Sequence, residues 1–90
     1  MSTTINLEDR TFYVGNFVPT TEEIIWLRSQ FEGYDFALDP RPLQNRFTIS
    51  MWDVEHPEAF LKCNIYYPFD LFDLKRIMQA MVEEIDRRWR

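Results

Sequence analysis

The chain has a single histidine and a single cysteine among its 90 residues, His56 and Cys63. Structural zinc sites use four Cys or His ligands at short spacings, so the sequence supplies too few ligands for one. A lone cysteine forms no disulfide within its own chain, and the sequence begins with no recognisable secretory signal, so we expect a reducing, cytoplasmic setting. No apolar run approaches the ~20 residues that span a bilayer, and we therefore expect no membrane partner.

Glycine is also scarce, with only Gly15 and Gly33 in the chain. The phosphate-binding loops of nucleotide enzymes need closely spaced glycines, which are absent here. Paired carboxylates hydrolyse glycosides only across a cleft, and a chain of this length has little depth for one. A nucleophile pair of Cys63 and His56 is disfavoured, because Cys63 is in phase with the apolar side of a predicted strand. We predict a protein that is not an enzyme and that binds no cofactor or metal.

Basic residues are outnumbered: 10 Lys and Arg against 15 Asp and Glu give a net charge of −5 and a pI near 4.7. The excess of acid lies in residues 1–60, which hold ten acids and four bases, whereas residues 61–90 hold five acids and six bases. Such a chain is not held to phosphate backbones by its overall charge. Direct binding of nucleic acid is therefore disfavoured.

Two amphipathic helices are predicted from capping signals and apolar spacing. Thr20 opens a capping box, and Gly33 supplies the left-handed residue that commonly ends a helix, which predicts a helix over residues 21–32. Apolar residues recur at helical spacing over residues 71–89, after the capping residue Asp70. Both helices have one apolar face to bury.

Alternating apolar and polar residues predict strands over residues 47–52 and 60–67, joined as a hairpin by the polar loop 53–58. Residues 11–18 and 34–38 are rich in β-forming types and predict two further strands. The elements then follow the order β-α-β-β-β-α.

The predicted fold is α+β, as a single domain over residues 1–90. It is a small antiparallel sheet of about four strands, with the two helices packed on one face. The opposite face of the sheet then has no helix over it, and its side chains are candidates for a binding surface.

The start of the chain resembles the opening of an RNA-recognition motif. The similar residues are Phe12-Tyr13-Val14-Gly15-Asn16-Phe17, followed by Thr21-Glu22-Glu23-Ile24, Leu27 and Phe31. This resemblance implies that Tyr13 stacks on a base at the exposed sheet face. The second family signature has a glycine and regularly spaced aromatics, which residues 45–52 lack, and the helix over 71–89 stands where the family has a short helix and a last strand.

Acidic residues concentrate around the first predicted helix and the loops, and two tryptophans stand out of phase with their apolar neighbours. Trp26 points away from the apolar face of its predicted helix, and Trp52 occupies the polar phase of its predicted strand. Aromatic side chains anchor protein interfaces and charge steers the encounter, which predicts a site for a basic partner. The predicted partner-binding residues are Glu22, Glu23, Trp26, Glu32, Asp35, Asp39, Trp52, Asp53 and Glu55. Solvated charge that serves only solubility is the alternative.

Short length, acidity and the absence of a cofactor motif form a profile that resembles the small phage-borne inhibitors of the anti-CRISPR kind. Those inhibitors share no motif, so the resemblance implies no residue roles. It implies a non-catalytic inhibitor in the host cytoplasm, monomeric or homodimeric. Its acidic, aromatic-containing surface would block a basic nucleic-acid-binding surface of a larger protein or nucleoprotein complex, such as a CRISPR effector. The alternatives are a nucleic-acid-binding module similar to the RNA-recognition motif and a small adaptor that dimerises through its terminal helix.

Overall fold

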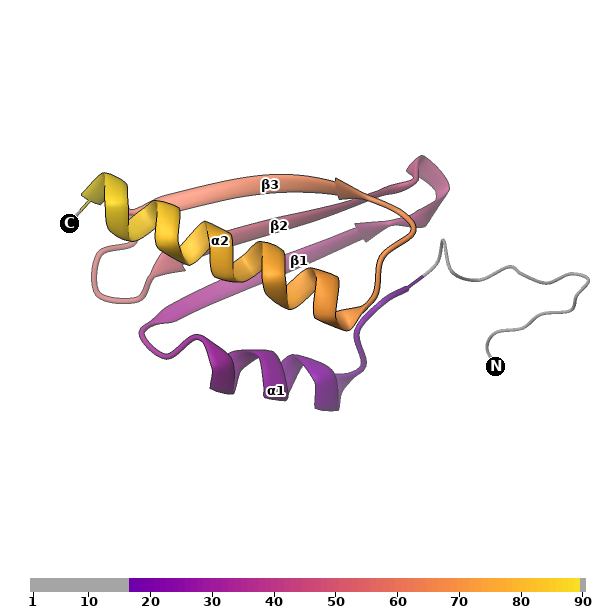
Figure 1. Cartoon of the computed structure of the whole chain (residues 1–90), viewed down its shortest axis with the longest axis horizontal. Coiled ribbons are helices and arrows are strands. Elements are labelled where there is room, and N and C mark those ends of the chain that lie inside the picture. The colour runs from indigo at the N-terminus through magenta and orange to yellow at the C-terminus, as the bar shows by residue number, and fades with distance from the viewer. Residues whose placement is uncertain (1–16, 90) are drawn as a thin grey trace, which may run out of the picture.

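A computed structural model describes residues 17–89 of the chain as a small sheet with two helices on one of its faces (Figure 1). Its three strands form one antiparallel sheet in the order β1-β2-β3. The α+β prediction is confirmed, with three strands in the described range where about four were expected. In chain order the elements are α1 (Thr21–Gln30), β1 (Tyr34–Arg41), the 3-10 helix η2 (Pro42–Gln44), β2 (Arg46–Asp53), β3 (Phe60–Tyr66) and α2 (Leu71–Trp89).

The difference in strand number concerns the predicted strand over residues 11–18. Residues 11–16 of that strand, Tyr13 among them, lie outside the described residues. Phe17 and Val18, at its end, lie in no strand. The order of elements in the described range therefore begins at α1.

β1 is longer than predicted, since it runs to Arg41 instead of ending near Leu38. Pro40 argued for the earlier end, because proline has no N–H to donate to a neighbouring strand. The Val54 N–H donates to the Gly33 carbonyl at 3.0 Å, so Gly33 faces β2. Along an antiparallel strand, successive residues direct their N–H and C=O groups alternately toward and away from the neighbouring strand. Pro40 is seven residues after Gly33 and therefore directs its nitrogen away from β2, so its missing N–H costs no hydrogen bond between β1 and β2.

α1 begins with the predicted capping box. The Glu23 N–H donates to Thr20 Oγ1 at 3.2 Å, and the Thr20 N–H donates to Glu23 Oε1 at 2.8 Å. The helix ends at Gln30, slightly before the predicted end, because Phe31 has left helical geometry. Gly33 then takes a φ of +87°, which a residue without Cβ adopts at little cost.

The core lies between the two helices and the sheet. β2 is the central strand and buries Phe47, Ile49 and Met51 on the side of the helices. The ring of Phe47 meets the rings of Phe69 and Tyr67 edge to face, with centroids 5.1 and 6.4 Å apart. The helices contribute Leu27, Leu74, Met78 and Ile85, each less than 2% exposed. This apolar layer holds both helices against one face, as predicted.

No helix within residues 17–89 covers the opposite face of the sheet, called here the open face (Figure 1). Its side chains follow from the register, in which Trp52 of β2 lies between Asp35 of β1 and Phe60 of β3. Arg46 lies in the same way between Arg41 and Tyr66 at the other end of the face. Aromatic and charged side chains therefore share the open face.

Candidate functional site

The structure brings five of the nine predicted partner-binding residues to one end of the sheet and leaves the other four apart from them. The end at which α1 and α2 finish and the β2–β3 loop lies, called here the loop end, consists of residues 31–35, 52–60 and 83–89 (Figure 1). It holds five of the predicted residues: Glu32, Asp35, Trp52, Asp53 and Glu55. Glu22 and Glu23 begin α1 and Asp39 lies late in β1, away from the loop end.

A hollow of about 610 Å³ at the loop end, called here the acidic hollow, collects carboxylates from separate segments of the chain. Its lining contains no Lys or Arg among the described residues. Clustered charge of one sign, in a concave surface with low-dielectric walls, focuses the field toward a ligand of opposite charge. The lining consists of Glu32, Gly33, Tyr34, Asp53, Val54, Glu55, His56 and Asp86.

Two residues of the acidic hollow, Tyr34 and Asp86, were not among the predicted site residues. The Tyr34 hydroxyl donates a hydrogen bond to Asp86 and so joins the start of β1 to the end of α2. The two residues are 52 positions apart in the chain. No local pattern in a sequence reports such a pairing, because it depends on how α2 crosses the sheet.

Asp53 lines the acidic hollow but is only 5% exposed. The Glu55 N–H donates to Asp53 Oδ1 at 2.9 Å, which fixes the turn that follows β2. The sequence placed Asp53 on an exposed acidic surface, and the structure instead buries it at the end of the central strand. Its charge adds to the field of the hollow, while Glu32, Glu55 and Asp86 are the exposed carboxylates of the lining.

Asp35 is held by interactions within the protein. The Phe36 N–H donates to Asp35 Oδ1 at 2.8 Å, and the Arg28 guanidinium donates to the same carboxylate. These contacts, the Phe36 N–H above all, hold the pKa of Asp35 below its ordinary value. Arg28 also lies over the Phe36 ring, 4.9 Å from its centroid. Asp35 therefore ties α1 to the edge of β1.

Trp26 is half-buried in the contact between the helices instead of standing free. Its ring meets the Phe72 ring of α2 edge to face, with centroids 6.2 Å apart. Lys75 Nζ lies 5.4 Å from the centroid of the Trp26 ring. The helical wheel of α1 placed Trp26 away from the sheet, and α2 covers that side.

Trp52 lies on the open face, as its polar phase in the strand predicted, but with bases as well as acids around it. Phe60, its neighbour on β3, is 44% exposed and Tyr66 is 61% exposed. Arg41 Nε donates to Asp39 Oδ1 at 3.1 Å on the same face. The open face is thus a mixed surface and not an acidic one.

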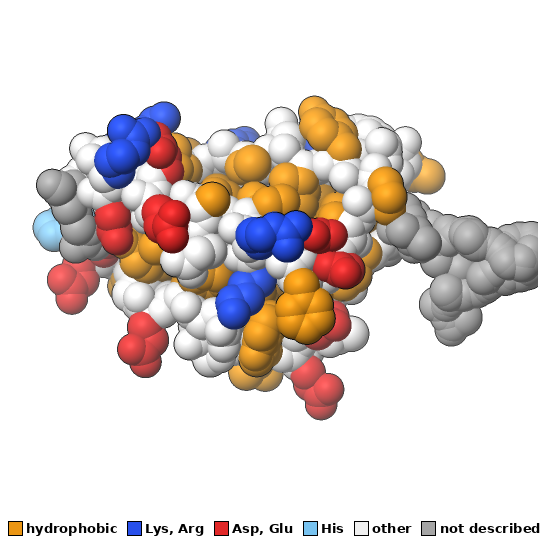
Figure 2. Space-filling view, in the orientation of Figure 1, with side chains coloured by type: hydrophobic (Ala, Val, Ile, Leu, Met, Phe, Trp, Pro, Cys, Tyr) orange, Lys and Arg blue, Asp and Glu red, His pale blue; other side chains and the backbone are white. Residues whose placement is uncertain are grey.

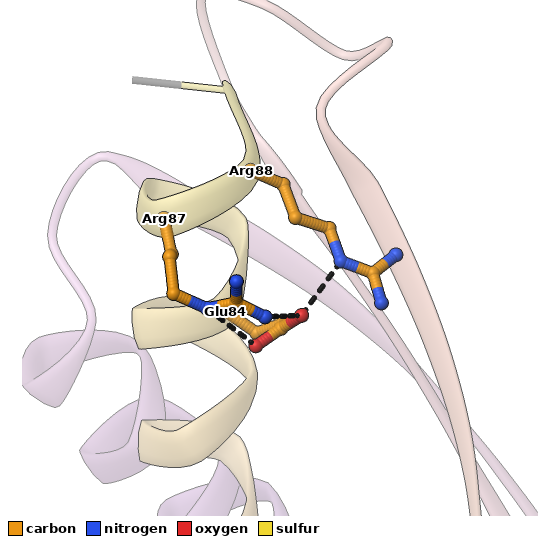
Figure 3. A network of polar contacts seen from close by, with 3 residues as sticks. All are labelled: Glu84, Arg87 and Arg88. Carbon is orange, nitrogen blue, oxygen red and sulfur yellow. Dashed lines mark hydrogen bonds and ion pairs between the residues drawn. The ribbon is translucent and has the colours of Figure 1, made fainter.

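The face covered by the helices is also mixed. Figure 2 shows Asp and Glu side chains spread along it, with Lys and Arg side chains between them. At the C-terminal end of α2, Arg87 Nε and Arg88 Nε donate to Glu84 at 3.2 and 2.6 Å (Figure 3). These hydrogen bonds hold the pKa of Glu84 below its ordinary value. The predicted carboxylates hence form no continuous surface over this face, and the acidic hollow is where several of them meet.

Between residues 17 and 89, no cluster of His, Cys, Asp and Glu is arranged to hold a metal ion. No helix in that range has the length and apolar character needed to cross a membrane. Comparison with known proteins finds no family model that matches the chain, and no curated protein or solved structure similar enough to count as a match.

Proposed function

We propose that this is a non-catalytic binding protein that inserts Lys or Arg side chains of a larger protein into its acidic hollow. By covering that basic surface, it blocks the binding of nucleic acid there, as an inhibitor of the anti-CRISPR kind would. The observation that carries the proposal is the acidic hollow itself, whose four carboxylates come from three segments of the chain and whose lining has no Lys or Arg in the described range.

The chemistry of the hollow suits a guanidinium or ammonium group. Glu32 and Glu55 are exposed on its rim, and Asp53 lies buried at its base. A cationic side chain that enters meets carboxylate oxygens on several sides, and charge-assisted hydrogen bonds of this kind are about twice as strong as neutral ones. The overall charge of −5 also favours a basic partner, because it steers the protein toward a positively charged surface.

The experiment compares two double variants that change the net charge equally. Glu32→Lys with Glu55→Lys reverses the rim of the acidic hollow, whereas Glu22→Lys with Asp39→Lys reverses two exposed carboxylates elsewhere. A partner is captured from lysate with the parent protein and identified, and its affinity is then measured by calorimetry at low and high salt. We expect the rim variant to bind at least about tenfold more weakly and the matched control to stay close to the parent.

A second readout separates competition from mere association. The captured partner is loaded with fluorescent RNA or DNA, and release is followed as the protein is added. Release by the parent and the control, but not by the rim variant, supports the proposal. Equal losses in both double variants, or a partner that binds no nucleic acid, contradict it.

The open face favours a second candidate, which is direct binding of single-stranded nucleic acid. Trp52, Phe60 and Tyr66 offer rings on this face, and Arg46 and Lys62 lie beside them. Bases stack on such rings at about 1–3 kcal/mol each. Tight binding of a random RNA pool that is weakened by Trp52→Ala, and not by reversal of the hollow rim, would select this candidate over the first.

A further inference from the structure

The two edges of the sheet differ in how their outward backbone groups are used. On β1, the outward Phe36 N–H is taken by the Asp35 carboxylate, the Tyr34 N–H donates to the Phe31 carbonyl at 3.1 Å, and Pro40 has no N–H. Of the four outward positions of β1, only Leu38 keeps an N–H with no partner among residues 17–89, so β1 offers little to another strand. An edge strand whose outward N–H and C=O groups have no hydrogen-bond partner is a template for pairing with a strand of another chain.

β3, at the other edge of the sheet, has outward N–H and C=O groups of this kind. The Asp53 N–H donates to the Ala59 carbonyl at 3.1 Å, so Ala59 faces β2, and the ladder alternates from there. The residues of β3 in the other phase direct their N–H and C=O groups away from β2. Among residues 17–89 no other strand, helix or loop pairs with them, and the Asn64 carbonyl accepts only a weak hydrogen bond from Cys63 Sγ at 3.7 Å. They are Phe60, Lys62, Asn64 and Tyr66.

An apolar groove of about 280 Å³ runs beside this edge, between β3 and α2. Leu61, Cys63 and Ile65 face the helices but are only half-buried, because α2 packs over β2 more than over β3. Ile77, Ala80 and Met81 form the α2 side of the groove, and Ala80 is exposed. A strand added to β3 would therefore gain apolar contacts as well as hydrogen bonds.

We infer that the occupant is a second copy of this chain, paired antiparallel through β3 about a two-fold axis at Cys63. β3 is self-complementary about that residue, since each position before Cys63 has the same character as the one equally far after it. In this register aromatic meets aromatic, aliphatic meets aliphatic and polar meets polar. The pairs are Phe60 with Tyr66, Leu61 with Ile65, and Lys62 with Asn64 of the second copy.

The position of α2 is compatible with the same two-fold axis. Ala80 and Cys63 both line the groove, so a two-fold at Cys63 brings the two α2 helices together near Ala80, running in opposite directions. Four residues before Ala80 stands Arg76, and four after it stands Glu84. The two-fold places the basic position of one helix opposite the acidic position of the other. A lysine often deters pairing at an edge, but here Lys62 faces an asparagine and not its own copy.

The test uses sedimentation equilibrium on the full chain, for which we expect a mass twice the 11.0 kDa of one chain. Asn64→Lys places like charges opposite each other at both Lys62 positions, and Asn64→Glu places opposite charges there. Both variants remove the Asn64 amide, whose oxygen accepts a hydrogen bond from Thr48 Oγ1 at 2.7 Å. We expect Asn64→Lys to dissociate about tenfold more readily than Asn64→Glu, with the difference shrinking at high salt.

Overall charge alone predicts the reverse order, because Asn64→Lys lowers the net charge of −5 in magnitude and Asn64→Glu raises it. The register is tested separately. Cys63 directs its N–H toward β2, so it meets its copy at a non-hydrogen-bonded position, where Cα atoms lie about 4.5 Å apart. Disulfides span that distance, so mild oxidation should give a cross-linked dimer rapidly. Cys63→Ser with Lys62→Cys should cross-link far more slowly.

A parent protein that sediments as one chain at high concentration overturns the inference, as do equal dissociation constants for the two Asn64 variants. The result is independent of the proposed function, because the groove and the acidic hollow share no lining residue. A dimer that binds no basic partner would refute the proposed function and leave this interface standing.

Discussion

At the scale of single residues, the core depends most visibly on Phe47. It is fully buried in the central strand and contacts two other rings, those of Tyr67 and Phe69. We expect Phe47→Ala to lower the free energy of unfolding by about 3–5 kcal/mol, because it removes apolar burial and leaves a cavity. Urea denaturation followed by circular dichroism measures the loss. Phe60→Ala, at a ring on the open face, is the matched control and should cost much less; equal losses would contradict the packing described here.

Residues whose surroundings are local in sequence were predicted well, and residues that depend on a distant segment were not. Leu27 and Phe31 are buried as the helical spacing predicted, and Trp52 lies on the open face. Trp26 was placed wrongly, because the helix that covers it follows some 50 residues later in the chain. Asp53 was placed wrongly because a carboxylate usually marks an exposed loop, whereas here it accepts a hydrogen bond at the end of a buried strand.

At the scale of the elements, the capping box of α1 gives a direct test. Thr20 Oγ1 accepts the Glu23 N–H, which would otherwise have no partner in the helix. We expect Thr20→Ala to destabilise the protein by about 1 kcal/mol, measured as a shift of the urea midpoint at constant m-value. Thr21→Ala, one position into the helix, keeps the cap and should change stability far less. A loss confined to Thr21→Ala would contradict the assigned cap.

The helices and the hairpin were predicted closely, because capping residues and apolar periodicity are local signals. The end of β1 was not, because the cost of a proline depends on whether its strand is central or at an edge. The candidate site was likewise predicted where it depends on local sequence and missed where it depends on distant segments. The sequence identified the acids of the loop end, but their meeting with Asp86 depends on the path of α2. Composition alone also suggested one acidic surface where the structure intersperses bases.

At the scale of the whole molecule, the charge network sets how stability depends on pH. Asp35, Asp73 and Glu84 all have pKa values lowered by hydrogen bonds to the charged carboxylate, from the Phe36 N–H, the Asp70 N–H and Arg87 respectively. A lowered pKa in the folded state means that the unfolded chain binds protons first as the pH falls. The stabilisation is therefore present above the ordinary values of 3.8 and 4.5 and is lost below them.

We accordingly expect the urea midpoint to be nearly constant near neutral pH and to fall as the pH drops through 4.5 and then 3.8. Burial raises the pKa of Tyr67 above 10.0, so stability should also fall when the pH rises beyond that value, as the unfolded tyrosine ionises first. Asp35→Asn should make the fall of the urea midpoint at acidic pH shallower, and Tyr67→Phe should do the same for the fall at alkaline pH. A midpoint that rises on acidification would contradict the assigned carboxylate contacts.

Pro40 has a consequence that extends past the single chain. Pro40 has no N–H, and the Phe36 N–H already donates to the Asp35 carboxylate, so the β1 edge of the sheet pairs poorly with another strand. Two molecules that join along their β3 strands use the one edge of the sheet that stays available among residues 17–89, and the outermost described strands of the pair are both copies of β1. Growth then stops at a closed pair, whereas a sheet with free N–H groups along both of its edges would pair on two sides and extend into a fibre.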